Sequence, residues 1–153
     1  MRDGALQIVP MRRCHIRACD EIAGHSEPWK SLQERIDFPM YISRKQAYVC
    51  VANKETAGFM IFTPEPVFAR GGYLRAIGVA PGMRRRGIGK KLLAFAERMT
   101  ARQSPNFYLC VSSFNRRAQA FYRALGYARV GNIPELIIRG SSEYIFWKRL
   151  RQR

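Results

Sequence analysis

The stretch that decides the fold runs Val79-Ala-Pro-Gly-Met-Arg-Arg-Arg-Gly-Ile-Gly-Lys-Lys-Leu-Leu93. A β-rich run, Tyr73 to Val79, leads into it and ends at Pro81-Gly82. Apolar residues at helical spacing then follow, namely Ile88, Leu92, Phe95 and Met99. We therefore expect a strand, a short turn and an amphipathic helix, with Gly87 and Gly89 at the first helical turn.

This turn has the chemistry of an anion-binding site. Glycines let the backbone approach a ligand closely, and the first N–H groups of a helix have no partner within it. Full positive charges surround the turn, at Arg84, Arg85, Arg86, Lys90 and Lys91. A pyrophosphate is the expected occupant. The glycine spacing differs from those of the Walker loop and the dinucleotide fingerprint, and two glycines in a basic helix start can also arise by chance.

A second motif lies downstream and runs Asn115-Arg-Arg-Ala-Gln-Ala-Phe-Tyr-Arg-Ala-Leu-Gly-Tyr127. Over about residues 74–130 the two motifs together resemble the Gcn5-related N-acetyltransferase (GNAT) superfamily. The first signature, Val-x-Pro-x-x-Arg-x-x-Gly-x-Gly, is matched by Val79, Pro81, Arg84, Gly87 and Gly89. The second, Asn-x-x-Ala-x-x-x-Tyr-x-x-x-Gly-Phe/Tyr, is matched by Asn115, Ala118, Tyr122, Gly126 and Tyr127.

The order of β-rich and helical segments predicts a mixed α/β sheet with helices packed on it. Strands are expected over 6–11, 47–52, 57–62, 73–79, 107–111, 130–138 and 144–148, and helices over 15–23, 31–37, 88–99 and 115–125. The second of these helices should end before Phe38-Pro39. The resemblance implies more: one domain over 1–153, a largely antiparallel sheet of six or seven strands with helices on both faces, and a V-shaped splay between the fourth and fifth strands.

The resemblance also implies that the chain binds acetyl-CoA. The CoA pyrophosphate would lie against the amides of Arg84, Arg85, Arg86, Gly87, Ile88, Gly89 and Lys90. The pantetheine arm would pair with backbone groups of Ile77 and Val79 in the splay. Its end would contact Asn115, and Tyr122 would lie beside the thioester sulfur.

The implied reaction is direct attack of a neutral primary amine on the thioester in a ternary complex. The Val79 N–H would stabilise the oxyanion, and Tyr122 would protonate the departing thiolate. The helical pattern alone allows Tyr122 to be a core residue, since it lies on an apolar stripe. No carboxylate stands on the strand 73–77 or at Cys110, where relatives carry one. The base is unassigned, with candidates Glu27, Glu34, Asp37, Glu143 and His25.

Charge is the most unusual property of the composition. The 153 residues include 27 Lys and Arg against 11 Asp and Glu, a formal net charge of +16. Between Val67 and Pro134 the only carboxylate is Glu97, whereas Arg and Lys occur 13 times. This balance favours polyanionic partners and disfavours capture of polyamines. It fits CoA, but also a non-catalytic CoA- or RNA-binding module, an RNA-linked acceptor such as aminoacyl-tRNA, or a basic surface that serves solubility.

Other features exclude several classes. No apolar run approaches the roughly 20 residues of a membrane span, and the first residues show no signal-peptide core, so we expect a cytoplasmic protein without membrane contact. The cysteines, Cys14, Cys19, Cys50 and Cys110, show no CxxC spacing, and no metal is expected. The apolar segment 144–147 could pair across a homodimer as well as within the sheet.

Overall fold

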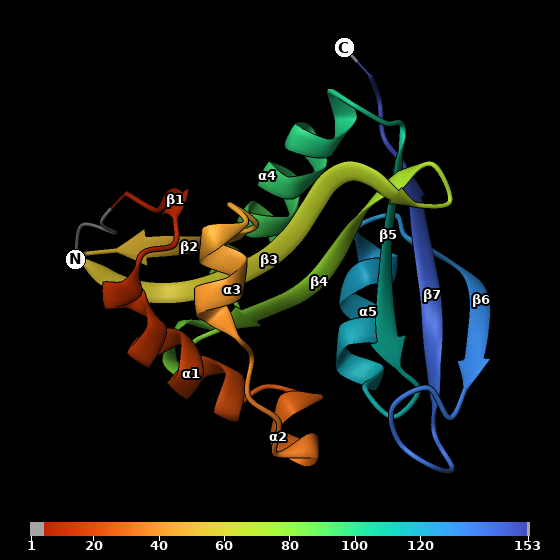
Figure 1. Cartoon of the computed structure of the whole chain (residues 1–153), viewed down its shortest axis with the longest axis horizontal. Helices are drawn as coiled ribbons and strands as arrows, with labels where there is room; N and C mark the ends of the chain where they lie inside the picture. Colours follow the sequence, from red (N-terminus) through yellow and green to blue (C-terminus); the bar gives the residue numbers. More distant parts are fainter. Residues whose placement is uncertain (1–4, 153) are drawn as a thin grey trace. The chain divides into compact units, whose positions relative to one another are not determined.

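A computed structural model describes residues 5–152 and is shown in Figure 1. The strands are β1 (Gln7–Pro10), β2 (Ala47–Ala52), β3 (Glu55–Phe68), β4 (Gly71–Val79), β5 (Asn106–Ser112), β6 (Ala128–Pro134) and β7 (Ser142–Arg149). The helices are α1 (Ile16–Gly24), α2 (Trp29–Leu32), α3 (Phe38–Ser43), α4 (Ile88–Ala101) and α5 (Arg116–Ala124), with short 3-10 helices η1 (Arg13–His15) and η2 (Pro81–Met83).

The seven described strands form one mixed sheet in the order β1-β2-β3-β4-β5-β7-β6. The β4–β5 pair is parallel, and the pairs β1–β2, β2–β3, β5–β7 and β6–β7 are antiparallel. The predicted class, a mixed and largely antiparallel sheet with helices, is therefore confirmed. The splay between the fourth and fifth strands stays a prediction.

One predicted helix boundary is wrong. The pattern predicted a helix over 31–37 that ends before Phe38-Pro39, but α2 ends at Leu32 and α3 begins at Phe38. Gln33 interrupts the helix with a left-handed φ of 53°. Asp37 then accepts a hydrogen bond from the Met40 N–H at 3.1 Å and caps α3. Proline is tolerated in a first helical turn because its missing N–H would have no helical partner there.

Two predicted strand ends differ from the structure by four residues or more. The strand expected over 57–62 continues to Phe68, since the φ of Pro64 and Pro66 is compatible with extended backbone. The strand expected over 130–138 ends at Pro134, because Glu135 adopts a φ of 51° and its carboxylate accepts the Gly140 N–H at 2.9 Å. That turn leads directly into β7.

The described chain divides into two compact units. The first comprises residues 5–62 and 76–95. Phe59 on β3 lies at its centre, with ring centroids 5.1 Å from Phe38 and 6.0 Å from Trp29. The opposite face of β2 and β3 packs against the first half of α4, where Phe95 lies 5.1 Å from Tyr48. Helices thus cover both faces of the sheet in this unit.

Close packing in the first unit depends on a glycine. A Cβ at Gly58 on β3 would lie 2.8 Å from the Gly78 carbonyl oxygen and 3.1 Å from the Ile88 side chain. Such distances would force the backbone or the helix to shift. The absence of a side chain at this position therefore lets the N-terminal turn of α4 lie directly against the sheet.

The second unit comprises residues 63–75 and 96–152. One face of its sheet is buried under α5 and the last turns of α4. Tyr122 on α5 packs on Phe146 of β7. Glu97 on α4 accepts hydrogen bonds from Lys148 at 3.0 Å and from Tyr127 at 2.9 Å. Figure 1 shows α5 beside β5 and β7. Because β7 pairs with both β5 and β6, the segment 144–147 has a paired strand on each side within the sheet.

No helix among residues 5–152 combines the length and the apolar character needed to cross a membrane.

Candidate active site

The predicted anion-binding turn lies between β4 and α4. Its backbone is extended at Arg84 and left-handed at Arg85 and Gly87, with φ of 63° and 75°. The first helical hydrogen bond runs from the Lys91 N–H to the Gly87 carbonyl at 2.9 Å. The three N–H groups before Lys91 therefore have no acceptor within the helix, and the helix dipole adds partial positive charge. A Cβ at Gly87 would meet nothing within 4 Å, so open space faces the turn.

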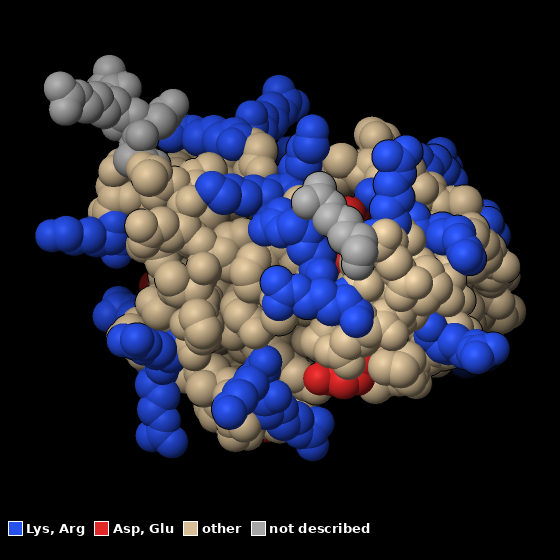
Figure 2. All heavy atoms as spheres, turned by 90° about the horizontal axis from the view of Figure 1, so that it is seen from above, with Lys and Arg blue, Asp and Glu red and all other residues tan. Residues whose placement is uncertain are grey.

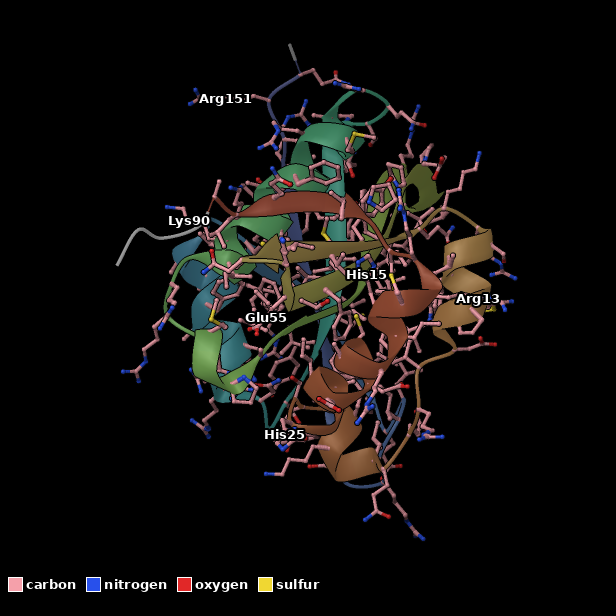
Figure 3. The ribbon with its side chains drawn as sticks, turned by 90° about the vertical axis from the view of Figure 1, so that its left-hand side faces the viewer. Arg13, His15, His25, Glu55, Lys90 and Arg151 are labelled. Carbon is pink, nitrogen blue, oxygen red and sulfur yellow. The ribbon has the colours of Figure 1, made fainter. Side chains whose placement is uncertain are left out.

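The basic side chains of this turn have different surroundings. Arg84 donates to the Val79 carbonyl at 3.3 Å and to the His25 carbonyl at 2.8 Å, which ties the turn to the end of α1. Its guanidinium is thus a structural anchor of the loop. Arg85, Arg86 and Lys90 are exposed. Figure 3 shows Lys90 on the first turn of α4 and His25 after α1.

Three of the candidate bases make local hydrogen bonds in the first unit. The His25 ring nitrogen lies 2.8 Å from the Glu21 carbonyl oxygen. Glu27 accepts the Ser31 N–H at 3.3 Å, and Asp37 caps α3. Glu34 is exposed between α2 and α3.

Tyr122 lies on the inner face of α5 and is 6% exposed. Its ring centroid is 5.7 Å from that of Tyr127 and 6.4 Å from that of Phe146. Burial raises the pKa of the phenol, so the hydroxyl stays protonated at neutral pH and can act as a proton donor. Within residues 5–152 the Tyr122 hydroxyl makes no hydrogen bond. Thr100 Oγ1 is the one side-chain oxygen or nitrogen there that is both fully buried and without a partner, so the Tyr122 hydroxyl is not fully buried.

Two side chains hold α5 at the end of β5. Asn115 accepts the Ala118 N–H at 3.1 Å and so caps the helix. The Gln119 amide donates to the Ser112 carbonyl at 3.2 Å and to the Ser113 carbonyl at 3.0 Å. The predicted contact of Asn115 with pantetheine stays a prediction, and the hydrogen bonds show that its Oδ1 already positions the helix that carries Tyr122.

A polar cluster occupies the sheet face opposite α5. Four side chains from three adjacent strands form it: Tyr73 on β4, Cys110 and Ser112 on β5, and Glu143 on β7. Ser112 donates to a Glu143 carboxylate oxygen at 2.5 Å, and the Tyr73 hydroxyl donates to the Cys110 sulfur. Sequence reasoning named Glu143 but missed its neighbours, since strand order is not visible in the motifs.

The environment of Glu143 favours its neutral form. The residue is 5% exposed, and burial raises the pKa of its carboxyl, while the hydrogen bond from Ser112 opposes that rise. The charge of Glu143 in turn contributes to the raised pKa values of Tyr73 and Cys110, for which burial is the largest cause. No group of three or more His, Cys, Asp or Glu side chains suited to a metal occurs within residues 5–152.

The raised pKa of Glu143 makes stability depend on pH. A carboxyl whose folded-state pKa exceeds its unfolded value stabilises the fold below the unfolded value, and this contribution is lost as the pH rises through the folded value. Glu143→Gln carries no such charge, so its melting temperature should exceed that of the wild type by about 2 °C or more near neutral pH. The gap should close near about pH 4. Thermal unfolding of both proteins across this range checks the sign, and a variant less stable at every pH would contradict it.

Comparisons with known proteins agree with this architecture. The family model for the acetyltransferase (GNAT) family matches residues 12–127. The ribosomal-protein-S18-alanine N-acetyltransferase of Escherichia coli is similar at TM-score 0.76 and 18% identity, over 97% of this chain and 96% of that one. Arabidopsis thaliana Naa50, in complex with the bisubstrate analogue CoA-Ac-MVNAL, has TM-score 0.76 and 20% identity, over 94% and 97%. Ard1 of Thermoplasma volcanium has TM-score 0.75 and 18% identity, over 96% and 99%.

No curated protein sequence matches the chain. The family model nevertheless covers most of its length, and the chain therefore belongs to the acetyltransferase (GNAT) family. The resemblance expected from the two motifs is confirmed.

Proposed function

We propose that this protein transfers the acetyl group of acetyl-CoA to a primary amine by direct attack in a ternary complex. The observation that carries the proposal is the turn before α4, where the first N–H groups have no acceptor within the helix and open space lies at the left-handed Gly87. Such a turn suits a pyrophosphate, because several N–H donors and the helix dipole act on one anion. The proposed ligand residues are Ile77, Val79, Arg84, Arg85, Arg86, Gly87, Ile88, Gly89, Lys90 and Asn115.

The charge of the chain supports the same ligand. Arg85, Arg86 and Lys90 are exposed beside the turn, whereas the guanidinium of Arg84 is used within the protein. The pyrophosphate would therefore be held by backbone N–H groups and these three cations, with Arg84 supporting the loop behind them. Figure 2 shows one face of the molecule, on which Lys and Arg side chains are numerous and acidic atoms few.

In the proposed reaction the neutral amine attacks the thioester carbonyl carbon, and the Val79 N–H stabilises the oxyanion. Collapse of the tetrahedral intermediate breaks the C–S bond. Tyr122 gives its proton to the CoA thiolate and takes one from the nitrogen, which leaves the neutral amide. A phenol with a raised pKa is a weak acid, but a thiolate leaving in an apolar site is a strong acceptor for its proton.

The proposed acceptors are neutral or acidic amines, including peptide amino termini. A net charge of +16 repels polyamines at long range and attracts acceptors that carry negative charge. The bisubstrate analogue bound by Naa50 joins CoA to a peptide, and we extend that class of acceptor to this chain as part of the proposal.

The test combines ligand binding with turnover. Thermal unfolding is measured with acetyl-CoA, CoA, ATP and a short RNA, and CoA release is then followed with propylamine, glycinamide, an acidic peptide with a free amino terminus, and spermidine. A saturating specific ligand should raise the melting temperature by several degrees, more with acetyl-CoA than with ATP. At least one neutral or acidic amine should then release CoA, faster than spermidine does.

Other outcomes would redirect the assignment. Stabilisation by acetyl-CoA without CoA release from any of the four amines would leave a CoA-binding module. Stabilisation by RNA alone, lost steeply between low and moderate salt as counterion release requires, would instead mean a basic RNA-binding domain.

A further inference from the structure

The only carboxylate of the polar cluster in the second unit has no ion-pair partner among residues 5–152. Glu143 is 5% exposed and accepts one hydrogen bond, from Ser112, on its Oε1. The ion pairs of Arg17 with Glu21 and of Lys148 with Glu97 do not involve Glu143. In a chain with 27 Lys and Arg residues, a buried carboxylate without an ion pair is conspicuous, because burying an uncompensated charge is costly.

The second oxygen of this carboxylate is open to a ligand. Glu143 Oε2 has no hydrogen-bond partner. Thr100 Oγ1 is the one side-chain oxygen or nitrogen of residues 5–152 that is both unpartnered and fully buried, so Oε2 is not fully buried. Oε2 is therefore reachable by water or by a small polar group. Ser113 fixes the backbone of Ser142, the residue before Glu143. Its hydroxyl accepts the Ser142 N–H at 3.1 Å, and its own N–H donates to the Ser142 carbonyl at 2.8 Å.

The neighbours of Glu143 define what can bind there. Tyr73 and Cys110 face it from β4 and β5, and the β6 residue opposite it is Ile133. Arg75 lies two residues beyond Tyr73 and acts on the Tyr73 phenol as a positive charge. One oxygen in a small polar site suits a compact ammonium better than a planar guanidinium, which prefers two oxygens. A single negative charge does not suit a polycation.

We propose that Glu143, positioned by Ser112, binds the acceptor amine as its ammonium and removes a proton from it before acetyl transfer. This inference rests on the proposed function and adds the catalytic base to it. Pairing between β4 and β5 covers Gly72 to Leu74 with Phe107 to Leu109, and Cys110 is the next residue of β5. The cluster therefore borders the end of the parallel ladder, where the proposed reaction places the thioester.

Two protons leave the acceptor nitrogen in the proposed reaction. The ammonium gives one proton to the Glu143 carboxylate and becomes a neutral amine, whose lone pair forms the C–N bond. The nitrogen of the tetrahedral intermediate then loses a second proton, the C–S bond breaks, and the CoA thiolate gains a proton from Tyr122, which recovers one from that nitrogen. The amide keeps one N–H, and Glu143 returns its proton to solvent.

The decisive experiment compares acceptors that do and do not need a base. Wild type and Glu143→Gln are assayed for CoA release with the fastest of the four amines above and with 2,2,2-trifluoroethylamine, which is largely neutral near pH 7.5. The variant should lose about 100-fold or more in kcat/KM with the protonated amine, the range typical of a positioned base. With trifluoroethylamine it should lose less than about threefold, because that amine arrives without the extra proton.

Two further variants separate catalysis from structure. Ser112→Ala should move the acid limb of the kcat/KM profile to higher pH, since the hydrogen bond that favours the charged carboxylate is gone. Glu65→Gln, an exposed carboxylate of the same unit, should match the wild type with both amines. Equal losses of Glu143→Gln with both amines, or none, would overturn the assignment of the base. A wild type that binds acetyl-CoA but acetylates no amine would overturn the proposed function itself, and this inference with it.

Discussion

Gly87→Val should raise the Kd for acetyl-CoA at least tenfold. Gly87 has a φ of 75°, a conformation that a β-branched residue adopts only at a cost of about 1–2 kcal/mol. Apart from the two chain neighbours of Gly87, no atom of residues 5–152 lies within 4 Å of a Cβ at this position, so the valine side chain would project into the space that we assign to the pyrophosphate. A strained turn and an occupied site both weaken binding, and each 1.4 kcal/mol corresponds to about a factor of ten.

Gly140→Val is the matched control. Gly140 has a φ of 78° and also has no atom within 4 Å of its Cβ position, but it lies in the turn before β7. Both variants should lose similar stability, whereas only Gly87→Val should weaken binding in a calorimetric titration with acetyl-CoA. An unchanged Kd in Gly87→Val would mean that this turn does not hold the ligand.

The architecture could be predicted largely from local patterns. The spacing of apolar residues differs between strands and helices and so indicates most of the elements. Gly126 ends α5 with a φ of 89°, as expected for a glycine after a helix. The turn before α4 was also visible, because its glycines and arginines follow a strand end directly. The start of α3 is the exception, because Phe38-Pro39 in the sequence indicates the end of a helix. The cap from Asp37 and the tolerance of proline in a first turn outweighed that signal.

The side-chain chemistry of the site was less predictable. The motif predicts that the backbone amide of Arg84 contacts the ligand, which stays a prediction. No spacing rule shows that its guanidinium donates to two carbonyls within the protein. Tyr73, Cys110 and Glu143 are far apart in the sequence and meet because β7 inserts between β5 and β6. Consecutive strands usually lie side by side, and this non-sequential order is set by packing of the whole sheet.

Tyr122→Phe should lower turnover at least about tenfold with little change in acetyl-CoA affinity, because it removes the proposed acid and keeps the ring. The hydroxyl makes no hydrogen bond within residues 5–152, and the ring contacts with Tyr127 and Phe146 are retained. The melting temperature should therefore change by less than about 2 °C. Turnover is measured by CoA release with the fastest amine acceptor, and affinity by calorimetry.

Tyr127→Phe gives the opposite expectation on a neighbouring ring. The Tyr127 hydroxyl donates to Glu97 at 2.9 Å on the helix-covered side of the sheet, so its loss should cost about 1–2 kcal/mol of stability and leave turnover intact. If Tyr122 were only a core residue, Tyr122→Phe would leave the rate of CoA release unchanged, as Tyr127→Phe does. Loss of turnover in Tyr122→Phe without loss of stability, and the reverse in Tyr127→Phe, would therefore place the proton transfer at Tyr122.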